Sequence, residues 1–593
     1  MDIAETKAKY AEEREKRLRS DGNDQYFRMA ENFEEYLDDP YVEIEQRETK
    51  SDHVDVAFVG GGYAGLVTGA RLAELGVTSY RVIEKGGDFG GTWYWNRYPG
   101  AMCDTASMIY MPLLEETGHM PREKYARAPE ILEHCRRIAT QYDLYDKALF
   151  HTRVTELRWL EESQVWQVKT DRGDAFTAQF VVVGTGPLHV PKLPGIPGLD
   201  TFNGHSFHTS RWDYSYTGGD AEGALMEGLT DKRVALIGTG ATAVQCVPHL
   251  SAACKKIYVC QRTPSSVDVR SNESMNADWY SEKTNEPGWQ KTWMENFTKN
   301  MSGASDGVDL VQDGWTDLAR RFLGKIAQLP VEERGDVVKM MEAYESSDFE
   351  KMDEIRGRVD EVVSDVETAE KLKAWYRQLC KRPCFHDDYL QSFNNASTVL
   401  LDTDGKGVER ITEGGIVVNG IEYPVDCIIY ATGFEIGTEL IDRAGFEMIG
   451  REELSLSDYW KNGMRTLHGI SVHNFPNAFR VQPTQAANFI ANVPHNIVES
   501  AKTIAMIINH VRASGFQTIE ATKEAEDDWQ ELLSGSMQML ADPSCTPGYY
   551  NNEGQPLPDN AVGYVGHPEG AMAYFKFIDG WREAGDFEGM SVS

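Results

Sequence analysis

The sequence predicts an α/β protein with two Rossmann-like dinucleotide-binding domains, a helical insertion and an N-terminal helical extension. Two glycine-rich turns, at residues 60–65 and 238–243, each follow a short apolar strand and open a helical segment, as dinucleotide-binding βαβ units require. Residues 268–375 are rich in charge and show helical periodicity, which indicates helices inserted after the second unit. Residues 1–50 show a similar mixed-charge pattern before the first strand.

The first dinucleotide unit consists of a strand at residues 54–59, the turn, a helix at 66–75 and a second strand at 79–83. Gly60, Gly62 and Gly65 permit the tight turn and let a pyrophosphate approach the helix N-terminus. Glu84 ends the second strand and can accept hydrogen bonds from both hydroxyls of an adenosine ribose. This unit therefore predicts an FAD site; a purely structural glycine turn is the alternative.

The second unit begins with a strand at residues 232–237, and the candidate contacts in its turn are Gly238, Gly240 and Thr242. Its next strand, residues 256–260, ends not in an acid but in Gln261-Arg262-Thr263-Pro264. A guanidinium pairs bidentately with phosphate, so Arg262 and Thr263 favour the 2′-phosphate of NADPH over a free ribose. An arginine that is merely solvated at a strand end is the alternative.

The remaining segments are assigned by composition. Within the extension, residues 4–19 and 25–39 predict helices that pack against the main body, with a frayed tail as the alternative. Within the insertion, residues 331–343 and 349–363 predict helices, and Ala431-Thr432-Gly433 marks a crossing into the FAD domain. The predicted division is an extension at 1–50, an FAD-binding domain at 51–195 and 399–545, an NADP-binding domain at 196–267 and 376–398, the insertion at 268–375 and a loop-rich C-terminal segment at 546–593.

Length and charge narrow the class of protein. The 593 residues suffice for several hydrophobic cores. The 59 Lys and Arg residues against 93 Asp and Glu residues give a net charge of −34, which disfavours nucleic acid and anionic membranes as partners. No apolar stretch approaches the length of a bilayer span, and residues 1–37 lack the apolar core of a signal peptide. We expect a cytoplasmic protein, either a monomer or a weak homodimer.

The nine cysteines are scattered, and none forms a Cys-x-x-Cys pair or a cluster with zinc-ligand spacing. We therefore expect no metal site. The pattern suits a reducing cytoplasm and counts against a flavin-linked disulfide reductase, because that class needs a redox-active cysteine pair. Cys380 and Cys384 are expected only to pack.

A twelve-residue run between the two turns carries a family resemblance. Its spacing, F-x-G-x-x-x-H-x-x-x-W-[P/D], is made by Phe202, Gly204, His208, Trp212 and Asp213. It resembles the fingerprint of Baeyer–Villiger monooxygenases, which are class B flavoprotein monooxygenases, and the resemblance covers roughly residues 50–545. It implies an enzyme that uses FAD, NADPH and O2 to convert ketones to esters or lactones, through a flavin C4a-peroxide and a tetrahedral adduct.

Two further segments are similar to the family. Residues 90–100, with Gly91, Thr92 and Trp93, match the flavin-contacting segment and are followed by Asp104, where the family has its active-site aspartate. Lys381-Arg382-Pro383 matches the segment whose arginine lies over the flavin. The resemblance implies that Asp104 and Arg382 are the catalytic pair and that Lys381 joins Arg262 on the 2′-phosphate.

Several alternatives stay open for these residues. Arg382 could form a surface ion pair with Asp387, and Asp104 could cap the following helix. His208 and Trp212 lie in the segment that links the two domains, so we assign them to NADPH-coupled domain movement; a core histidine with a satisfied hydrogen bond and a core tryptophan are the alternatives.

Two departures bear on the substrate. Asp213 stands where many family members have proline, and Gln482-Pro483-Thr484-Gln485 departs from the Gly-Pro-x-Ser-Pro form of enzymes for small cyclic ketones. With the extension, this resembles the subgroup that accepts large-ring or polycyclic ketones. The rival functions are a flavin-dependent N- or S-oxygenating monooxygenase, an NADPH flavin reductase or oxidase without organic substrate, and a non-catalytic flavin-bound partner protein.

Overall fold

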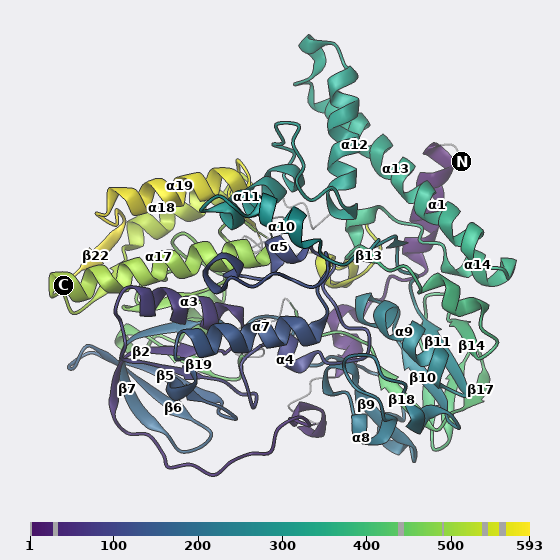
Figure 1. Cartoon of the computed structure of the whole chain (residues 1–593), viewed down its shortest axis with the longest axis horizontal. Helices are drawn as coiled ribbons and strands as arrows, with labels where there is room; N and C mark the ends of the chain where they lie inside the picture. Colours follow the sequence, from purple (N-terminus) through teal and green to yellow (C-terminus); the bar gives the residue numbers. More distant parts are fainter. Residues whose placement is uncertain (1–2, 28–33, 437–443, 489–491, 537–543, 557–564) are drawn as a thin grey trace.

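Two sheets, each covered by helices, form the body of the molecule in the computed structural model (Figure 1). The structure describes residues 3–27, 34–436, 444–488, 492–536, 544–556 and 565–593. The sheets lie side by side, and a group of helices spans the region above them (Figure 1). The predicted α/β fold class with two Rossmann-like domains is confirmed.

The larger sheet has eight strands and contains the first glycine-rich turn. Its order is β19-β5-β6-β7-β2-β3-β4, with β20 beside β7. The parallel core places β2 between β3 and β7, and helix α3 (Tyr63–Glu74) follows β2 directly. The strand bounds are β2 (His53–Val59), β3 (Tyr80–Ile83), β4 (Ala148–Leu149), β5 (Val154–Leu160), β6 (Val165–Thr170), β7 (Ala175–Val183), β19 (Glu447–Ile449) and β20 (Ala478–Arg480).

The smaller sheet has five parallel strands in the order β14-β11-β10-β18-β9 and contains the second turn. Its strands are β9 (His205–His208), β10 (Arg233–Ile237), β11 (Lys256–Gln261), β14 (Thr398–Asp402) and β18 (Cys427–Tyr430), and α9 (Ala241–Ala253) follows β10. Since β14 and β18 both belong here, the chain leaves this sheet only after Tyr430. The predicted return to the FAD domain at residue 399 is too early.

The N-terminal extension packs on the body but is not two helices. Helix α1 (Ile3–Glu15) forms as expected, whereas β1 (Tyr26–Phe27) pairs with β8 (Leu193–Pro194). A 3-10 turn covers Glu34–Leu37, and residues 28–33 lie outside the described residues. The predicted helix at 25–39 is therefore wrong over its described part, because tertiary pairing with β8 outweighs local helix preference.

The insertion is helical, as predicted, and its longest pair of helices projects from the body (Figure 1). The predicted helices at 331–343 and 349–363 are in fact one helix that begins at Val337. Asp336 fixes this start, since its carboxylate accepts hydrogen bonds from the backbone N–H groups of Val338 and Lys339. The insertion contains α10 (Ala277–Lys283), α11 (Trp289–Met301), α12 (Gly314–Gln328), α13 (Val337–Val362) and α14 (Val366–Leu372).

The C-terminal part is more regular than predicted. Helix α19 (Ala571–Ala584) buries Tyr574, Phe575 and Ile578 on one face, and β22 (Met590–Val592) pairs with β21 (Ile519–Ala521). The expectation of a loop-rich segment is wrong for these residues; the helical spacing of the apolar side chains was the available signal.

Further helices and strands lie between these elements in the described residues. The remaining helices are α4 (Thr92–Trp95), α5 (Ser107–Tyr110), α6 (Leu114–Thr117), α7 (Ala128–Gln141), α8 (Tyr214–Thr217), α16 (Leu456–Trp460), α17 (Val493–Ser514) and α18 (Lys523–Ser534). The remaining strands are β12 (Val267–Asp268), β13 (Cys384–Phe385), β15 (Arg410–Thr412), β16 (Gly415–Val418) and β17 (Ile421–Pro424). In the described ranges, no helix combines the length and the apolar character that crossing a bilayer needs.

Candidate active site

The first glycine-rich turn is closely packed against its neighbours. Gly60 has φ +112°, and a Cβ there would lie 2.6 Å from the carbonyl oxygen of Gly184. A Cβ on Gly65 would collide with the carbonyl oxygen of Gly60, and one on Gly62 would lie 3.3 Å from the Cα of Gly91. The turn therefore presents bare backbone at the N-terminus of α3, which is the arrangement that a dinucleotide pyrophosphate needs.

Glu84 lies against this turn as predicted. Its side chain is buried, and its two oxygens accept hydrogen bonds from the backbone N–H of Gly61 at 2.5 Å and of Gly86 at 2.7 Å. Burial raises the pKa of Glu84, while the two N–H groups act in the opposite direction. The carboxylate is thus fixed at the end of β3, the position where dinucleotide-binding folds carry the acid that binds an adenosine ribose.

The segment after β3 links the turn to Asp104. Gly91 has φ +53° and caps α4, in which Trp93 is buried and donates from Nε1 to the hydroxyl of Tyr110 at 3.2 Å. The left-handed backbone at Gly91 explains the need for glycine there. The predicted contacts Gly91, Thr92 and Trp93 therefore lie next to the first turn.

The structure brings the predicted pair Asp104 and Arg382 together. Arg382 Nη1 lies 2.7 Å from Asp104 Oδ2, and Arg270 Nη2 bonds the other oxygen, Oδ1. Burial alone would raise the pKa of Asp104, but Arg382 and then Arg270 hold it below its usual value. The carboxylate is therefore charged and shared by two guanidinium groups.

The alternatives for these two residues do not fit the structure. The Asp387 carboxylate accepts from the backbone N–H of Arg270 and Ser271, at 3.0 and 3.1 Å, rather than pairing with Arg382. Helix α5 begins at Ser107 without a side-chain cap, so Asp104 does not cap it.

Arg270 is a site residue that the sequence did not indicate. It follows β12, whereas Arg382 precedes β13, the parallel partner of β12, so the two arginines come from opposite ends of this strand pair and their side chains meet at Asp104. Its side chain is 3% exposed, against 34% for Arg382. Arg270 is therefore the fixed partner of Asp104 and Arg382 the accessible one; no local sequence pattern marks such a contact.

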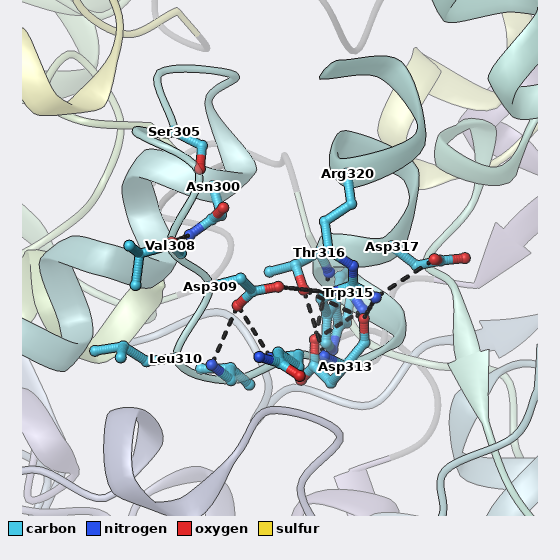
Figure 2. A network of polar contacts seen from close by, with 12 residues as sticks. Asn300, Ser305, Val308, Asp309, Leu310, Asp313, Trp315, Thr316, Asp317 and Arg320 are labelled. Carbon is cyan, nitrogen blue, oxygen red and sulfur yellow. Dashed lines mark hydrogen bonds and ion pairs between the residues drawn. The ribbon is translucent and has the colours of Figure 1, made fainter. Parts of the chain in front are cut away.

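The helical insertion also reaches Asp104, through the start of α12. Figure 2 shows the polar contacts around this helix start. Asp313 caps this helix by accepting from the backbone N–H of Trp315 at 3.0 Å and of Thr316 at 3.3 Å. The indole of Trp315 donates to the carbonyl oxygen of Asp104 at 2.9 Å and packs against Phe385. The capping pattern Asp-Gly-Trp-Thr could have predicted the helix start, but not this contact.

The second glycine-rich turn is equally open to a ligand. Gly238 has φ +113°, and a Cβ there would collide with the carbonyl oxygen of Ala431, whereas Gly240 has free space and caps α9. Thr242 lies in the first turn of α9. The hydroxyl of Thr263 is buried and has no hydrogen-bond partner among the described residues. An orphaned donor beside Arg262 fits a site that a phosphate completes.

Arg262 and Lys381 lie near each other, as predicted, but with unpredicted neighbours. Arg262 Nη1 donates to Gln25 Oε1 at 2.5 Å, and its Nη2 lies 3.4 Å from Glu553 Oε2. Lys381 Nζ donates to the carbonyl oxygen of Pro547 at 3.2 Å. Burial, with Arg262 next in effect, lowers the pKa of Lys381 to about 8.

The fingerprint residues hold the connection between the two sheets. A Cβ on Gly204 would collide with the ring of Phe202, and Trp212 is buried with its Nε1 donating to Thr217 Oγ1 at 3.1 Å. Asp213 caps α8 by accepting from the backbone N–H of Ser215 at 3.0 Å, which gives its carboxylate a structural use.

His208 is a buried and neutral residue of this connection. Its Nδ1 accepts from the backbone N–H of Ser210 at 3.2 Å, which satisfies one side of the ring. Burial lowers the pKa of His208 to about 3, so the ring carries no charge at neutral pH. The geometry fits the core alternative for His208 and Trp212; the expectation of domain movement stays a prediction.

One expectation about the cysteines is wrong. Cys380 forms a disulfide with Cys545, 165 positions further along the chain, whereas Cys384 is buried and free. The bridge ties the residue before Lys381 to a segment that we name the C-terminal strap (residues 545–555). Two cysteines so far apart in sequence give no local signal of pairing.

Two dinucleotide-type sheets with a buried carboxylate–guanidinium pair define a flavoprotein oxidoreductase of the two-dinucleotide class. Residues 57–286 match the family model described as pyridine nucleotide-disulphide oxidoreductase. The chain is 46% identical to neopentalenolactone D synthase of Streptomyces avermitilis, covering 100% of this chain and 99% of the relative. It is also 46% identical to a Baeyer–Villiger monooxygenase of Streptomyces coelicolor, covering 98% and 96%.

The solved structures agree with these sequence relatives. A polycyclic ketone monooxygenase from Thermothelomyces thermophila superposes with a TM-score of 0.90 at 36% identity, covering 100% of this chain and 99% of that chain. A steroid monooxygenase bound to NADP gives a TM-score of 0.73 at 28% identity, covering 91% and 99%. The chain belongs to the Baeyer–Villiger monooxygenases.

Proposed function

We propose that this enzyme converts bulky cyclic ketones to esters or lactones with NADPH and O2, with FAD at the first glycine-rich turn and NADPH at the second. The observation that carries the proposal is the buried Asp104 with Arg382 on its accessible side. Once reduced by NADPH, bound FAD supplies the O2-derived oxygen atom that is inserted beside the carbonyl.

Arg382 acts on the carbonyl oxygen of the substrate, where negative charge develops during the insertion. A guanidinium stays protonated even when it is desolvated, so its charge is permanent. One fixed donor of this kind contributes about 2.7–4 kcal/mol to the stability of a transition state. Asp104 orients Arg382 through its 2.7 Å contact, and Arg270 holds Asp104 from the buried side.

The second site selects the coenzyme. We assign Arg262 and Lys381 to the 2′-phosphate of NADPH, and Gly238, Gly240 and Thr242 to its pyrophosphate at the start of α9. The hydroxyl of Thr263 is buried and unpartnered in the described part of the chain, which supports its use in binding the phosphate. His208 and Trp212 are assigned to the connection through which the two sheets move relative to each other.

The substrate class follows from the relatives and the sequence together. The structure with a TM-score of 0.90 is a polycyclic ketone monooxygenase, and another neighbour is a steroid monooxygenase. The segment Gln482–Gln485 differs from the form implied for small cyclic ketones. Both observations favour polycyclic or large-ring ketones.

The decisive experiment is a screen of cyclic, macrocyclic and steroid ketones with NADPH and O2. We expect products that are one oxygen atom heavier than the ketone, formed in step with NADPH consumption. With an amine or a thioether offered beside the ketones, an amine N-oxide or sulfoxide as the sole product would favour the N- or S-oxygenating alternative. Hydrogen peroxide released one for one with NADPH, whatever the ketone, would favour an oxidase.

Location and assembly complete the proposal. We assign the enzyme to the cytoplasm as a monomer or weak homodimer. The presence of seven free, buried cysteines supports a reducing compartment, although Cys380 and Cys545 are paired. Sedimentation of the FAD-loaded enzyme over a range of concentrations tests the assembly.

A further inference from the structure

The C-terminal strap lies directly over the cations assigned to the 2′-phosphate. Its first residue, Cys545, is bonded to Cys380, which precedes Lys381. Pro547 accepts a hydrogen bond from Lys381 Nζ at 3.2 Å, and a Cβ on Gly548 would lie 3.2 Å from the same nitrogen. The strap therefore contacts Lys381 through Pro547 and Gly548 and is bonded to the residue before it.

The strap places the carboxylate of Glu553 next to Arg262. Its side chain is 4% exposed, its Oε2 lies 3.4 Å from Arg262 Nη2, and its Oε1 accepts from the hydroxyl of Tyr26 at 3.2 Å. Gln25 accepts from the other terminal nitrogen of Arg262 at 2.5 Å. Both terminal nitrogens of the guanidinium are thus engaged by residues outside the dinucleotide fold.

The backbone of the strap is held in a strained form to achieve this. Asn552 and Glu553 have φ of +52° and +54°, a backbone region that residues other than glycine rarely adopt. Asn551 fixes the turn, because its Oδ1 accepts from the backbone N–H of Gly548 at 2.9 Å and of Gly554 at 3.2 Å. Strain retained at one position is a pointer to function.

The charges around Glu553 are unbalanced. The Nζ of Lys192 lies 3.8 Å from the ring centroid of Tyr26. Burial lowers the pKa of Lys192; the charge of Glu553 acts to raise this pKa, and the charge of Arg262 acts to lower it. Three cations, Arg262, Lys381 and Lys192, therefore share a neighbourhood with the Glu553 carboxylate. A phosphate with about two negative charges would complete the balance, but the carboxylate would repel it.

We infer that Glu553 limits the affinity for the 2′-phosphate of NADPH by competing with that phosphate for Arg262. The inference rests on the proposed function, which places the phosphate at Arg262 and Lys381. A carboxylate and a phosphate both bind a guanidinium through oxygen, so one can occupy the place of the other. Glu553 is thus a specificity-determining residue whose removal improves binding.

The test measures binding of adenosine 2′,5′-bisphosphate and of 5′-AMP to the FAD-loaded enzyme by calorimetry. The variant Glu553→Gln removes the charge and can still accept from Tyr26. We expect 2′,5′-bisphosphate to bind about three- to tenfold more tightly, with 5′-AMP unchanged, because one opposing charge is removed next to the phosphate. Glu553→Ala should act in the same direction, and the KM for NADPH should fall in parallel.

Matched variants separate the inference from the proposed function. Glu361→Gln, an exposed residue of α13, changes the net charge equally and should leave both affinities unchanged. Arg262→Ala should abolish the preference for the 2′,5′-bisphosphate; if that preference survives, the proposed phosphate site is wrong. If Arg262→Ala abolishes the preference but Glu553→Gln leaves binding unchanged or weaker, only the inference about Glu553 is overturned.

Discussion

Asp104 is shared by two arginines whose exposure to solvent differs. Arg270 is 3% exposed and Arg382 34% exposed, and each bonds one carboxylate oxygen. One negative charge against two positive charges leaves the group with a net charge of +1. Because Arg270 already neutralises part of the carboxylate, Arg382 keeps an effective positive charge on the side where we propose that the substrate reacts.

Replacement of Arg382 tests this role directly. We expect Arg382→Ala to continue NADPH oxidation while ester or lactone formation falls about 100- to 1,000-fold, as when one donor is removed from an oxyanion site. The electrons from the consumed NADPH should then reduce O2 to hydrogen peroxide. The measurement is the ratio of lactone to NADPH consumed, with Arg382→Lys as the control that retains the charge but loses the planar geometry. An unchanged lactone yield in Arg382→Ala would contradict the assignment.

The removal of Asp104 should instead affect stability. Asp104→Asn leaves Arg270 buried without its counter-ion, which costs about 3–5 kcal/mol. The urea midpoint of unfolding should fall, and the double variant Asp104→Asn with Arg270→Gln should recover part of the loss. Equal urea midpoints for Asp104→Asn and the double variant would show that Asp104 and Arg270 are not coupled in stability.

The same residue gives a pH dependence with a defined sign. The pKa of folded Asp104 lies below that of an unfolded aspartate, about 3.9, so its ion pairs stabilise the fold fully above that value. This stabilisation is lost as the pH falls through the lower folded-state pKa. The difference in stability between wild type and Asp104→Asn should therefore be constant near neutral pH and shrink below about pH 4.

At the scale of elements, helix α12 links the insertion to Asp104. Trp315 stands in its first turn and donates to the carbonyl oxygen of Asp104 at 2.9 Å. Trp315→Phe keeps an aromatic ring against Phe385 but leaves this oxygen without its donor. We expect a loss of about 1 kcal/mol in stability and a several-fold slower lactone formation. The control is Trp279→Phe, at an exposed position of α10. Equal effects of the two substitutions would show that the hydrogen bond from Trp315 to Asp104 contributes nothing specific.

Elements that are defined locally could be predicted from the sequence. Both βαβ units were placed correctly, because strand, glycine turn and helix follow each other within about 30 residues. The place of β18 was not predictable in this way. Its partners β10 and β9 lie nearly 200 and more than 200 positions earlier, and parallel pairing over such distances leaves no local pattern. The boundary at residue 399 was wrong for this reason.

The residues of the candidate site also fall into two groups: those that have a local signal in the sequence and those that have none. Glu84 could be named from the spacing of its βαβ unit, and Asp104 and Arg382 from the resemblance of their segments to the family. Arg270 and Glu553 could not be named, since their importance comes only from what lies opposite them in space. Helix α19 is a different case, because its apolar spacing was visible and was outweighed by the Gly, Pro and Asn residues before it.

At the scale of the whole molecule, four segments that are distant in sequence meet at Arg262. The extension supplies Gln25 and Tyr26, the second dinucleotide unit supplies Arg262, the segment after the insertion supplies Lys381, and the C-terminal strap supplies Glu553. Arg262 is therefore enclosed by the N-terminal extension and the C-terminal strap. The bridge between Cys380 and Cys545 holds the strap at its first residue, and hydrogen bonds hold it further along.

A count of free thiols tests whether the bridge between Cys380 and Cys545 is formed. The chain has nine cysteines, of which seven are free, so the denatured and unreduced protein should titrate seven thiols and the reduced protein nine. Cys545→Ser should lower the urea midpoint of unfolding, because a disulfide that closes a long loop contributes about 2–4 kcal/mol. Cys384→Ser is the matched control: it replaces a free, buried cysteine close to Cys380 and leaves the bridge intact. Nine thiols in the unreduced wild type, or equal midpoints for Cys545→Ser and wild type, would mean that the strap is held over Arg262 by its hydrogen bonds alone.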